Sequence, residues 1–295
     1  MTDHEQWDIA SGVGVTALGV ALCRAIETRR GGLAEDPYAE KFLAASALPP
    51  SMARTLPEVD APTAELGPLW RSMPTYLGVR TRFFDEYLTQ AGRLGVRQVV
   101  LIAAGLDTRA FRLDWAPGTS VFELDQARVL RFKDEVLREE GARPRCDRRV
   151  VAADLRDDWP QALCVAGFDP SRPTAWLVEG LLSFLPAHAE QALFRRLREL
   201  SVPGSWLALD SIAGDERDHV VDSPFAVAAA GTPFAVGSST VWQTELRPDP
   251  IDVLRAAGWT VTVEPVADAA RRYGRTVEGV MSVPATVTML LTARR

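Results

Sequence analysis

The sequence predicts an α/β fold, with a seven-stranded, mostly parallel sheet that is covered by helices on both faces and ends in an antiparallel pair. Two observations predict it. From residue 97 onward, short apolar runs alternate with helical stretches, which is the pattern of a parallel sheet. The last two strand candidates are joined by a segment without a long helical pattern, which indicates that these two strands pair antiparallel.

The N-terminal part is expected to be helical. Leu18, Leu22 and Ile26 stand at helical spacing, and two consecutive glycines at 31–32 end that helix. Asp36 is the expected N-cap of a short second helix. The expected helices cover 13–30, 38–45 and 78–94, and the proline-rich stretch 48–68 is expected to be an irregular connection.

The rest of the chain supplies the sheet. Parallel strands are expected at 97–103, 119–124, 148–153, 174–179 and 205–211, with helices at 126–140, 157–166 and 186–200. A helix at 249–257 and strands at 259–266 and 285–293 complete the pattern. We therefore expect an α-helical cap at 1–94 and a core at 95–295, with an insertion at 213–248.

Composition narrows the class of protein. Of 295 residues, 47% are hydrophobic and 24% are charged, as in a globular protein with a full core. The net charge of −6 leaves no basic surplus for a nucleic-acid backbone. The three cysteines are widely spaced, and neither a secretory signal nor an apolar stretch of about 18 residues occurs. We expect a soluble cytoplasmic protein with no nucleic-acid partner, no membrane partner and no metal site.

The turn after the first strand is the most informative segment. The apolar run 99–102 ends in Ala103, Ala104 and Gly105, and an acid, Asp125, ends the following strand. This layout is typical of a nucleoside held at the carboxyl edge of a parallel sheet. A dinucleotide-binding turn has the pattern G-x-G-x-x-G, whereas a single glycine stands among alanines here. The turn therefore favours an adenosine ligand without phosphates, such as S-adenosylmethionine.

Acids at the ends of successive strands suit the parts of that ligand. Asp125 suits the ribose diol, and Asp154 with Leu155 offers the adenine an acceptor and an apolar wall. Glu179 follows an apolar strand and suits the ammonium group, because a buried acid needs a partner. Each acid also has an ordinary structural interpretation as a cap of the next helix. Their occurrence together favours the ligand site.

Five segments also carry a family resemblance. They are 101–113 (LIAAGLDTRAFRL), 122–126 (FELDQ), 179–185 (EGLLSFL), 36–39 (DPYA) and 80–85 (RTRFFD). In the same order, these resemble the elements GAGxDTRxxRL, FEvDqP, EGLLmYL, DPyA and RTrffD of the leucine carboxyl methyltransferase family of S-adenosylmethionine-dependent enzymes. That family includes bacterial enzymes that act on polyketide and other small carboxylic acids. The resemblance implies a Rossmann-like class I methyltransferase fold, which agrees with the strand pattern.

The resemblance also implies roles for residues at matching positions. Arg80 would pair with the cofactor carboxylate, helped by Arg24, and Gly105 would let the backbone approach the methionine portion. The ribose, adenine and amino group would be held by Asp125, by Asp154 with Leu155, and by Glu179. The sequence departs from the signature at Ala103, where the family has glycine.

Methyl transfer to the carboxylate of a small acid is the expected reaction. A carboxylate has a reference pKa of about 4 and is ionised at neutral pH, so no general base is required. Of the three histidines, we would test only His219 as a base. It lies in the insertion, which we interpret as a lid over the substrate, with Phe225, Phe234 and Trp242 as its aromatic residues. Trp70, Met73 and Tyr76 are the expected opposing wall.

Three alternatives stay open. Methylation of a hydroxyl group would need His219 or an acid as base. The second alternative is a non-catalytic regulatory protein that binds S-adenosylmethionine; the combined set Arg80, Asp125 and Glu179 weighs against it. An NAD-dependent oxidoreductase is disfavoured by the single-glycine turn.

Overall fold

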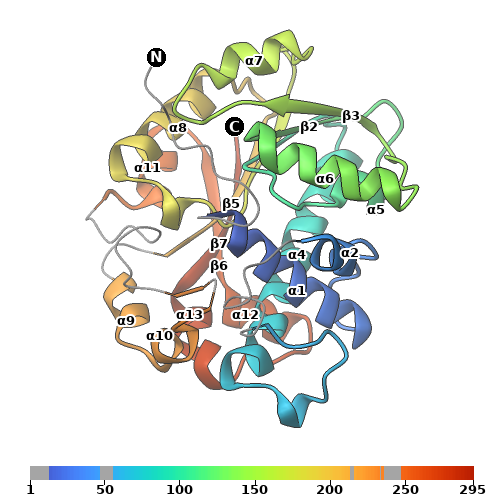
Figure 1. Cartoon of the computed structure of the whole chain (residues 1–295). Coiled ribbons are helices and arrows are strands. Elements are labelled where there is room, and N and C mark those ends of the chain that lie inside the picture. Colours follow the sequence, from blue (N-terminus) through green and yellow to red (C-terminus); the bar gives the residue numbers. More distant parts are fainter. Residues whose placement is uncertain (1–12, 47–55, 213–215, 233, 236–246) are drawn as a thin grey trace.

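The computed structural model of the chain describes residues 13–46, 56–212, 216–232, 234–235 and 247–295 (Figure 1). A seven-stranded sheet with the order β3-β2-β1-β4-β5-β7-β6 forms its centre. The strands are β1 (Gln98–Ile102), β2 (Ser120–Asp125), β3 (Asp147–Ala152), β4 (Thr174–Val178), β5 (Trp206–Ile212), β6 (Thr260–Pro265) and β7 (Thr288–Arg294). β1 to β5 are parallel, and β7 is antiparallel to β5 and β6. The predicted sheet is therefore confirmed.

Helices cover both faces of this sheet. They are α1 (Val13–Arg29), α2 (Ala39–Ala45), α4 (Pro68–Arg93), α5 (Arg109–Arg112), α6 (Ala127–Glu139), α7 (Trp159–Val165), α8 (Ala187–Glu199), α9 (Arg217–Val221), α10 (Pro224–Ala229), α11 (Pro250–Ala256), α12 (Val266–Arg272) and α13 (Ser282–Val287). Short 3-10 helices are η1 (Thr63–Glu65), η2 (Leu182–Phe184) and η4 (Gly279–Met281). In Figure 1, α8 and α11 lie on one side of the sheet, and α1, α4 and α6 lie on the other.

Two hydrophobic clusters fill the space between the sheet and its helices. Residues of β1 alternate between them: Val99 and Leu101 pack with α1 and α4, whereas Val100 and Ile102 pack with α7 and α8. All five residues of β1 are buried, which explains why the four residues after Gln98 are all apolar; Gln98 itself bonds to Thr174 of β4. The helices α1 and α4 share a hydrophobic cluster with β1, so they pack on the same core as the sheet. The division into a cap at 1–94 and a core at 95–295 stays a prediction.

The long helix before the sheet differs from the prediction. α4 begins at Pro68 rather than at residue 78, and it contains Pro74. Pro68 occupies the first turn, where its missing N–H group breaks no helical bond. The prolines predict an irregular connection over 48–68. A proline in the first turn is nevertheless compatible with a helix that continues after it. Residues 47–55 of that connection lie outside the described residues.

The predicted N-cap at Asp36 is wrong. The N-cap residue of α2 is Tyr38, and its N–H donates to one carboxylate oxygen of Asp36 at 3.1 Å. The other oxygen of Asp36 accepts from Nε of Arg24 at 2.8 Å. Asp36 is buried and needs a charged partner, so it ties α1 to the loop before α2. At the other end of the chain, β7 begins at Thr288 rather than at 285, because α13 precedes it.

Candidate functional site

A cavity of about 530 Å³ lies at the carboxyl ends of the parallel strands. Parallel strands bring all their carboxyl ends to one edge of the sheet, so the residues that follow β1, β2, β3 and β4 meet there. The lining includes every residue that was predicted to bind the cofactor, namely Arg24, Arg80, Gly105, Asp125, Asp154, Leu155 and Glu179.

The turn after β1 forms one wall of this cavity. Ala103 has φ 54° and Gly105 has φ 46°, so both stand in the left-handed region. Glycine adopts that conformation readily, whereas alanine does so at a cost of about 1–2 kcal/mol. A Cβ atom at Gly105 would lie 3.7 Å from Cβ of Ala17, which is an ordinary contact. The backbone conformation, rather than space, therefore favours glycine at 105.

Asp125 is joined to this turn by a hydrogen bond. The Gly105 N–H donates to Oδ2 of Asp125 at 2.6 Å, and the Gln126 N–H donates to Oδ1 at 2.6 Å. Burial raises the pKa of Asp125 above its usual range, and these two N–H groups partly offset that effect. The carboxylate is therefore held by backbone donors at the edge of the cavity.

Asp154 and Leu155 follow β3, as predicted. The carboxylate of Asp154 accepts from Nε and Nη2 of Arg156 at 2.9 and 2.6 Å, and its Oδ1 also accepts the Arg156 N–H. Leu155 is half-buried and packs against the hydrophobic cluster of α7 and α8. The pair thus presents a polar group and an apolar surface side by side.

Arg80 of α4 is held between two carboxylates. Its Nε donates to Oε1 of Glu179 at 3.0 Å, and its Nη1 lies 3.2 Å from Oδ2 of Asp210. Burial lowers the pKa of Arg80, but Asp210 and Glu179 outweigh this effect and raise the pKa above its usual value. The guanidinium is charged and fixed in the wall of the cavity.

Asp210 of β5 was not identified from the sequence. It lines the cavity, and its Oδ1 accepts the Gly180 N–H at 2.6 Å. Burial raises the pKa of Asp210, and Arg80 only partly offsets the effect. The available signal was an acid directly after the apolar run 206–209, since such an acid is costly unless it is paired.

Gly180 has a steric role beside Arg80. Its φ is +65°, and a Cβ atom there would lie 3.2 Å from Nη1 of Arg80. Any larger residue at 180 would strain the backbone and crowd the guanidinium.

Arg24 of α1 reaches the same turn from the other side. Its Nη2 donates to the carbonyl oxygen of Leu106 at 2.7 Å, while its Nε binds Asp36. The side chain is buried and lines the cavity. The structure therefore places Arg24 beside the turn.

Three segments of the family resemblance, 80–85, 101–113 and 179–185, converge in one ion-pair network beside the cavity. Arg109 binds three carboxylates. Its Nε lies 2.6 Å from Oδ1 of Asp85, and its Nη1 lies 2.7 Å from Oε2 of Glu179 and also binds Asp107. Arg112 binds both oxygens of Asp85, at 2.6 and 2.8 Å. No role for Arg109 or Asp85 could be predicted from local pattern, because Asp85 and Glu179, which bind Arg109, lie 24 and 70 positions away from it.

Part of the remaining lining is apolar. We call this part the apolar end; it consists of Met73, Ile212, Val220, Phe225, Met281 and Pro284. Residues of α10 lie close to α4 and η4, and residues of α9 lie close to α13, so these elements enclose it together. Tyr76 also lines the cavity, and its hydroxyl bonds to Oγ1 of Thr288 at 3.0 Å.

The predicted lid and opposing wall are placed in part. Phe225 and Phe234 of the insertion line the cavity, and so do Met73 and Tyr76 of α4. Trp70 is buried, with its ring centroid 6.0 Å from that of Phe234. Trp242 lies outside the described residues.

His219 lies away from the cavity lining. Its side chain is 67% exposed, and its Nδ1 lies 2.6 Å from Oε2 of Glu216. His188 does line the cavity, but it is exposed and belongs to α8, which packs on the opposite face of the sheet from the apolar end. Among the described residues, no cluster of three or more metal-ligating side chains occurs. Nor does any described helix have the length and apolar character of a membrane span.

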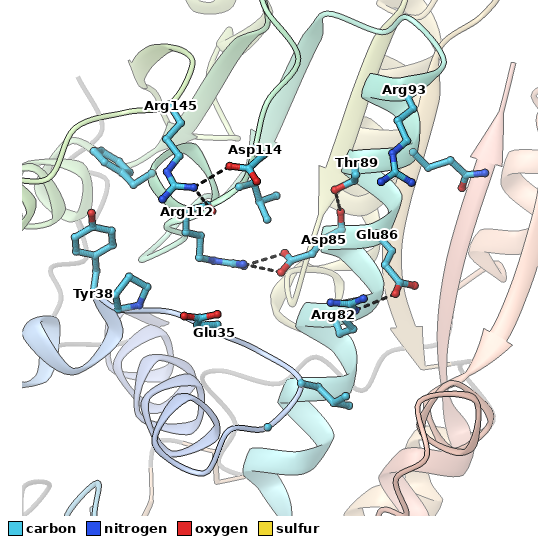
Figure 2. A pocket seen from close by; sticks show the side chains of 16 residues that line it. Glu35, Tyr38, Arg82, Asp85, Glu86, Thr89, Arg93, Arg112, Asp114 and Arg145 are labelled. Atoms are coloured by element: carbon cyan, nitrogen blue, oxygen red, sulfur yellow. Dashed lines mark hydrogen bonds and ion pairs between the residues drawn. The ribbon is translucent and has the colours of Figure 1, made fainter.

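A second, polar groove of about 950 Å³ borders the ion-pair network (Figure 2). Charged side chains of both signs line it, and Figure 2 shows Asp85 pointing toward Arg112 and Asp114 pointing toward Arg145. Because these carboxylates and guanidiniums already pair with one another, the groove presents no surplus of either charge to a ligand. The cavity at the strand ends is the candidate site.

Similar proteins match most of the chain. A protein of Saccharopolyspora erythraea with the name "Putative S-adenosyl-L-methionine-dependent methyltransferase" is 47% identical over 276 residues, which cover 93% of each chain. A protein of Rhodococcus jostii with the same description is 47% identical over 278 residues, which cover 94% of this chain and 92% of that protein.

Solved structures share the fold. A DUF574 family protein from Streptomyces avermitilis has a TM-score of 0.54 and 19% identity, covering 92% of this chain and 96% of that one. A magnesium protoporphyrin IX methyltransferase from Synechocystis has a TM-score of 0.50 and 14% identity, covering 83% and 92%. At these identities the likeness shows the fold alone, and it confirms the predicted class I methyltransferase architecture.

The sequence profile of one family, leucine carboxyl methyltransferase, matches residues 17–198, which include all five segments of the resemblance. Together with the identity to the two bacterial relatives, this match shows that the chain belongs to the leucine carboxyl methyltransferase family.

Proposed function

We propose that the protein transfers a methyl group from S-adenosylmethionine to the carboxylate of an apolar small-molecule acid, which becomes a methyl ester. The observation that carries this proposal is one cavity with two kinds of lining. Charged groups at the strand ends suit the cofactor, and the apolar end suits the acceptor. The assignment of the relatives as S-adenosylmethionine-dependent methyltransferases supports the same cofactor.

The charged groups fit the cofactor part by part. Arg80, with Arg24 nearby, offers a cation to the cofactor carboxylate, and Glu179 offers an acid to the ammonium group. Asp125 offers its carboxylate to the ribose hydroxyls, and Asp154 with Leu155 borders the position expected for adenine. When bound, S-adenosylmethionine supplies an electrophilic methyl group and leaves as S-adenosylhomocysteine.

The protein's own contribution is orientation and exclusion of water. Residues of the apolar end, such as Met73 and Phe225, would hold the acceptor by its hydrophobic part. The six residues of the apolar end are uncharged, and Arg80 of the cavity wall is already paired with Glu179 and Asp210. An acceptor carboxylate there would have no fixed cation to neutralise it, so it would stay reactive toward the sulfonium methyl group.

A hydroxyl acceptor is the alternative, and it would need a base. Asp210 is the carboxyl group of the cavity that we consider as this base, since burial raises its pKa. Both of its oxygens are already engaged, one by the Gly180 N–H and one by Arg80. We therefore favour the carboxylate.

The test is a paired screen. The protein is incubated with S-adenosylmethionine and matched panels of apolar carboxylic acids and of the corresponding alcohols and phenols, followed by mass spectrometry. We expect acids to gain one methyl group that mild alkali removes, as from an ester. An alkali-stable product on the alcohols would support the hydroxyl alternative instead, and binding of S-adenosylhomocysteine without turnover of either panel would support a regulatory role.

Two variants make the screen specific. Asp125→Ala should abolish turnover at low cofactor concentration. Asp147→Ala should not, because Asp147 is an exposed aspartate of β3 that pairs with Arg149 and Ser120 outside the cavity.

A further inference from the structure

Arg109 is a buried cation that does not line the cofactor cavity. Its side chain is 3% exposed, and its guanidinium is surrounded by the carboxylates of Asp85, Asp107 and Glu179. Three carboxylates around one guanidinium are more than its charge neutralises. Burial lowers the pKa of Arg109, but these acids outweigh the effect and keep its pKa well above the usual value.

The carboxylate of Glu179 is bound by two guanidiniums, those of Arg80 and Arg109. On the side of the cavity, Nε of Arg80 donates to Oε1 of Glu179 at 3.0 Å. On the other side, Nη1 of Arg109 donates to Oε2 at 2.7 Å. A carboxylate with one guanidinium on each oxygen has its plane and its position fixed. If Arg80 turns toward a cofactor carboxylate, Arg109 still holds Glu179 in place.

Asp85 in turn fixes Arg109. It lies on α4, five residues after Arg80, and its carboxylate accepts from Arg109 and from both terminal nitrogens of Arg112. Figure 2 shows this carboxylate directed at Arg112 on the side of the polar groove. The chain Asp85–Arg109–Glu179 thus connects α4, α5 and the end of β4.

Four carboxylates and three guanidiniums make up this network: Asp85, Asp107, Glu179 and Asp210 with Arg80, Arg109 and Arg112. With all groups ionised, its net charge is −1. Glu179 and Asp107 both line the cavity and pair with Arg109, and Glu179 also pairs with Arg80, so the surplus negative charge is available to an ammonium group there.

We propose that Arg109, held by Asp85, is a positioning residue that sets Glu179 for the amino group of the cofactor. This inference rests on the proposed function, in which Glu179 meets that amino group. Arg109 does not line the cavity, so its effect on binding passes through the carboxylates that it holds there, Glu179 and Asp107.

The test compares two ligands that differ in the amino-acid portion. S-adenosylhomocysteine has it, and 5′-methylthioadenosine lacks it but keeps the adenosine and the sulfur. Calorimetry measures Kd for both ligands with the wild type, Arg109→Gln and Asp85→Asn. We expect each variant to weaken S-adenosylhomocysteine binding by about tenfold, roughly the effect of one charge-assisted hydrogen bond, and to leave 5′-methylthioadenosine within about twofold.

Two further proteins complete the design. Arg109→Lys keeps the charge but not the planar fork, so its affinity for S-adenosylhomocysteine should fall between those of the wild type and Arg109→Gln. Arg82→Gln is the matched control, because Arg82 lines the groove, pairs with Glu86 and has no contact with Glu179.

Each outcome has a distinct meaning. Equal weakening of both ligands in the variants would show a general structural role and overturn the proposal, and so would unchanged S-adenosylhomocysteine binding. If the wild type itself bound the two ligands equally, the assignment of Glu179 and Arg80 to the amino-acid portion would fail, which is a failure of the proposed function. Asp85→Asn preserves side-chain volume, so the proposal stays testable if Arg109→Gln does not fold.

Discussion

The backbone N–H of Gly105 donates a hydrogen bond of 2.6 Å to Oδ2 of Asp125, which joins the turn after β1 to the end of β2. The bond sets the carboxylate beside the left-handed turn, at the edge of the cavity. A side chain fixed in this way needs no reorganisation to accept the two hydroxyls of a ribose.

Replacement of Asp125 by asparagine should therefore weaken cofactor binding. The amide has one acceptor oxygen and no charge, so we expect an increase of about 10- to 100-fold in the Kd of S-adenosylhomocysteine, which corresponds to about 1.5–3 kcal/mol. Titration calorimetry measures it, with Asp147→Asn as control. A Kd within twofold of the wild type would remove Asp125 from the binding site.

Substitution of glycine for Ala103 should stabilise the protein. Among the described residues, Ala103 is the one non-glycine residue with positive φ, at 54°. Glycine relieves a strain of about 1–2 kcal/mol but increases the entropy of the unfolded chain, so a net gain of about 0.5–1 kcal/mol is expected. Chemical denaturation of Ala103→Gly and the wild type measures this gain. Lower stability of the variant would mean that the turn at Ala103 is relaxed.

Replacement of Arg80 and of Arg82 by alanine compares the contributions of buried and exposed ion pairs to the free energy of unfolding. Arg80→Ala leaves Glu179 and Asp210 short of a cation in a buried site and should cost about 3 kcal/mol. Arg82→Ala removes an exposed pair with Glu86 and should cost less than about 0.5 kcal/mol. The free energy of unfolding of the two variants without ligand is the measurement. Similar losses would contradict the buried network.

Asp107 should make stability depend on pH in the acid range. Burial by itself would raise its pKa, but Arg109, Lys133 and Arg112 lower the pKa from 3.8 to about 2. The folded state therefore holds the proton less tightly than the unfolded chain. This stabilisation, about 2 kcal/mol, is complete above the unfolded pKa and is lost as the pH falls from about 4 to about 2.

Urea denaturation of the wild type and Asp107→Asn at several pH values checks this prediction. The free-energy difference between the two proteins should be constant near neutral pH and should shrink between about pH 4 and pH 2. A difference that does not change over that window would show that Asp107 is not ion-paired in the folded state.

The sequence by itself determined the sheet and the residues around the cavity. Strands buried on both faces are largely apolar, so the runs 99–102 of β1 and 175–178 of β4 stand out. Parallel pairing brings the ends of such strands to one edge, and for this reason Gly105, Asp125 and Glu179 could be placed together from their positions after strands. These are local patterns, which a single chain displays directly.

Only the tertiary structure decided which charged groups pair. Arg109 and Glu179 are 70 positions apart, and Arg80 and Asp210 are 130 apart. An arginine has several acids within plausible reach of its long side chain, and its choice depends on distances that the packing of α4 and α5 against the sheet sets to within an ångström. The early start of α4 has the same origin, because its buried face against the sheet stabilises a helix across Pro74 that local propensity opposes.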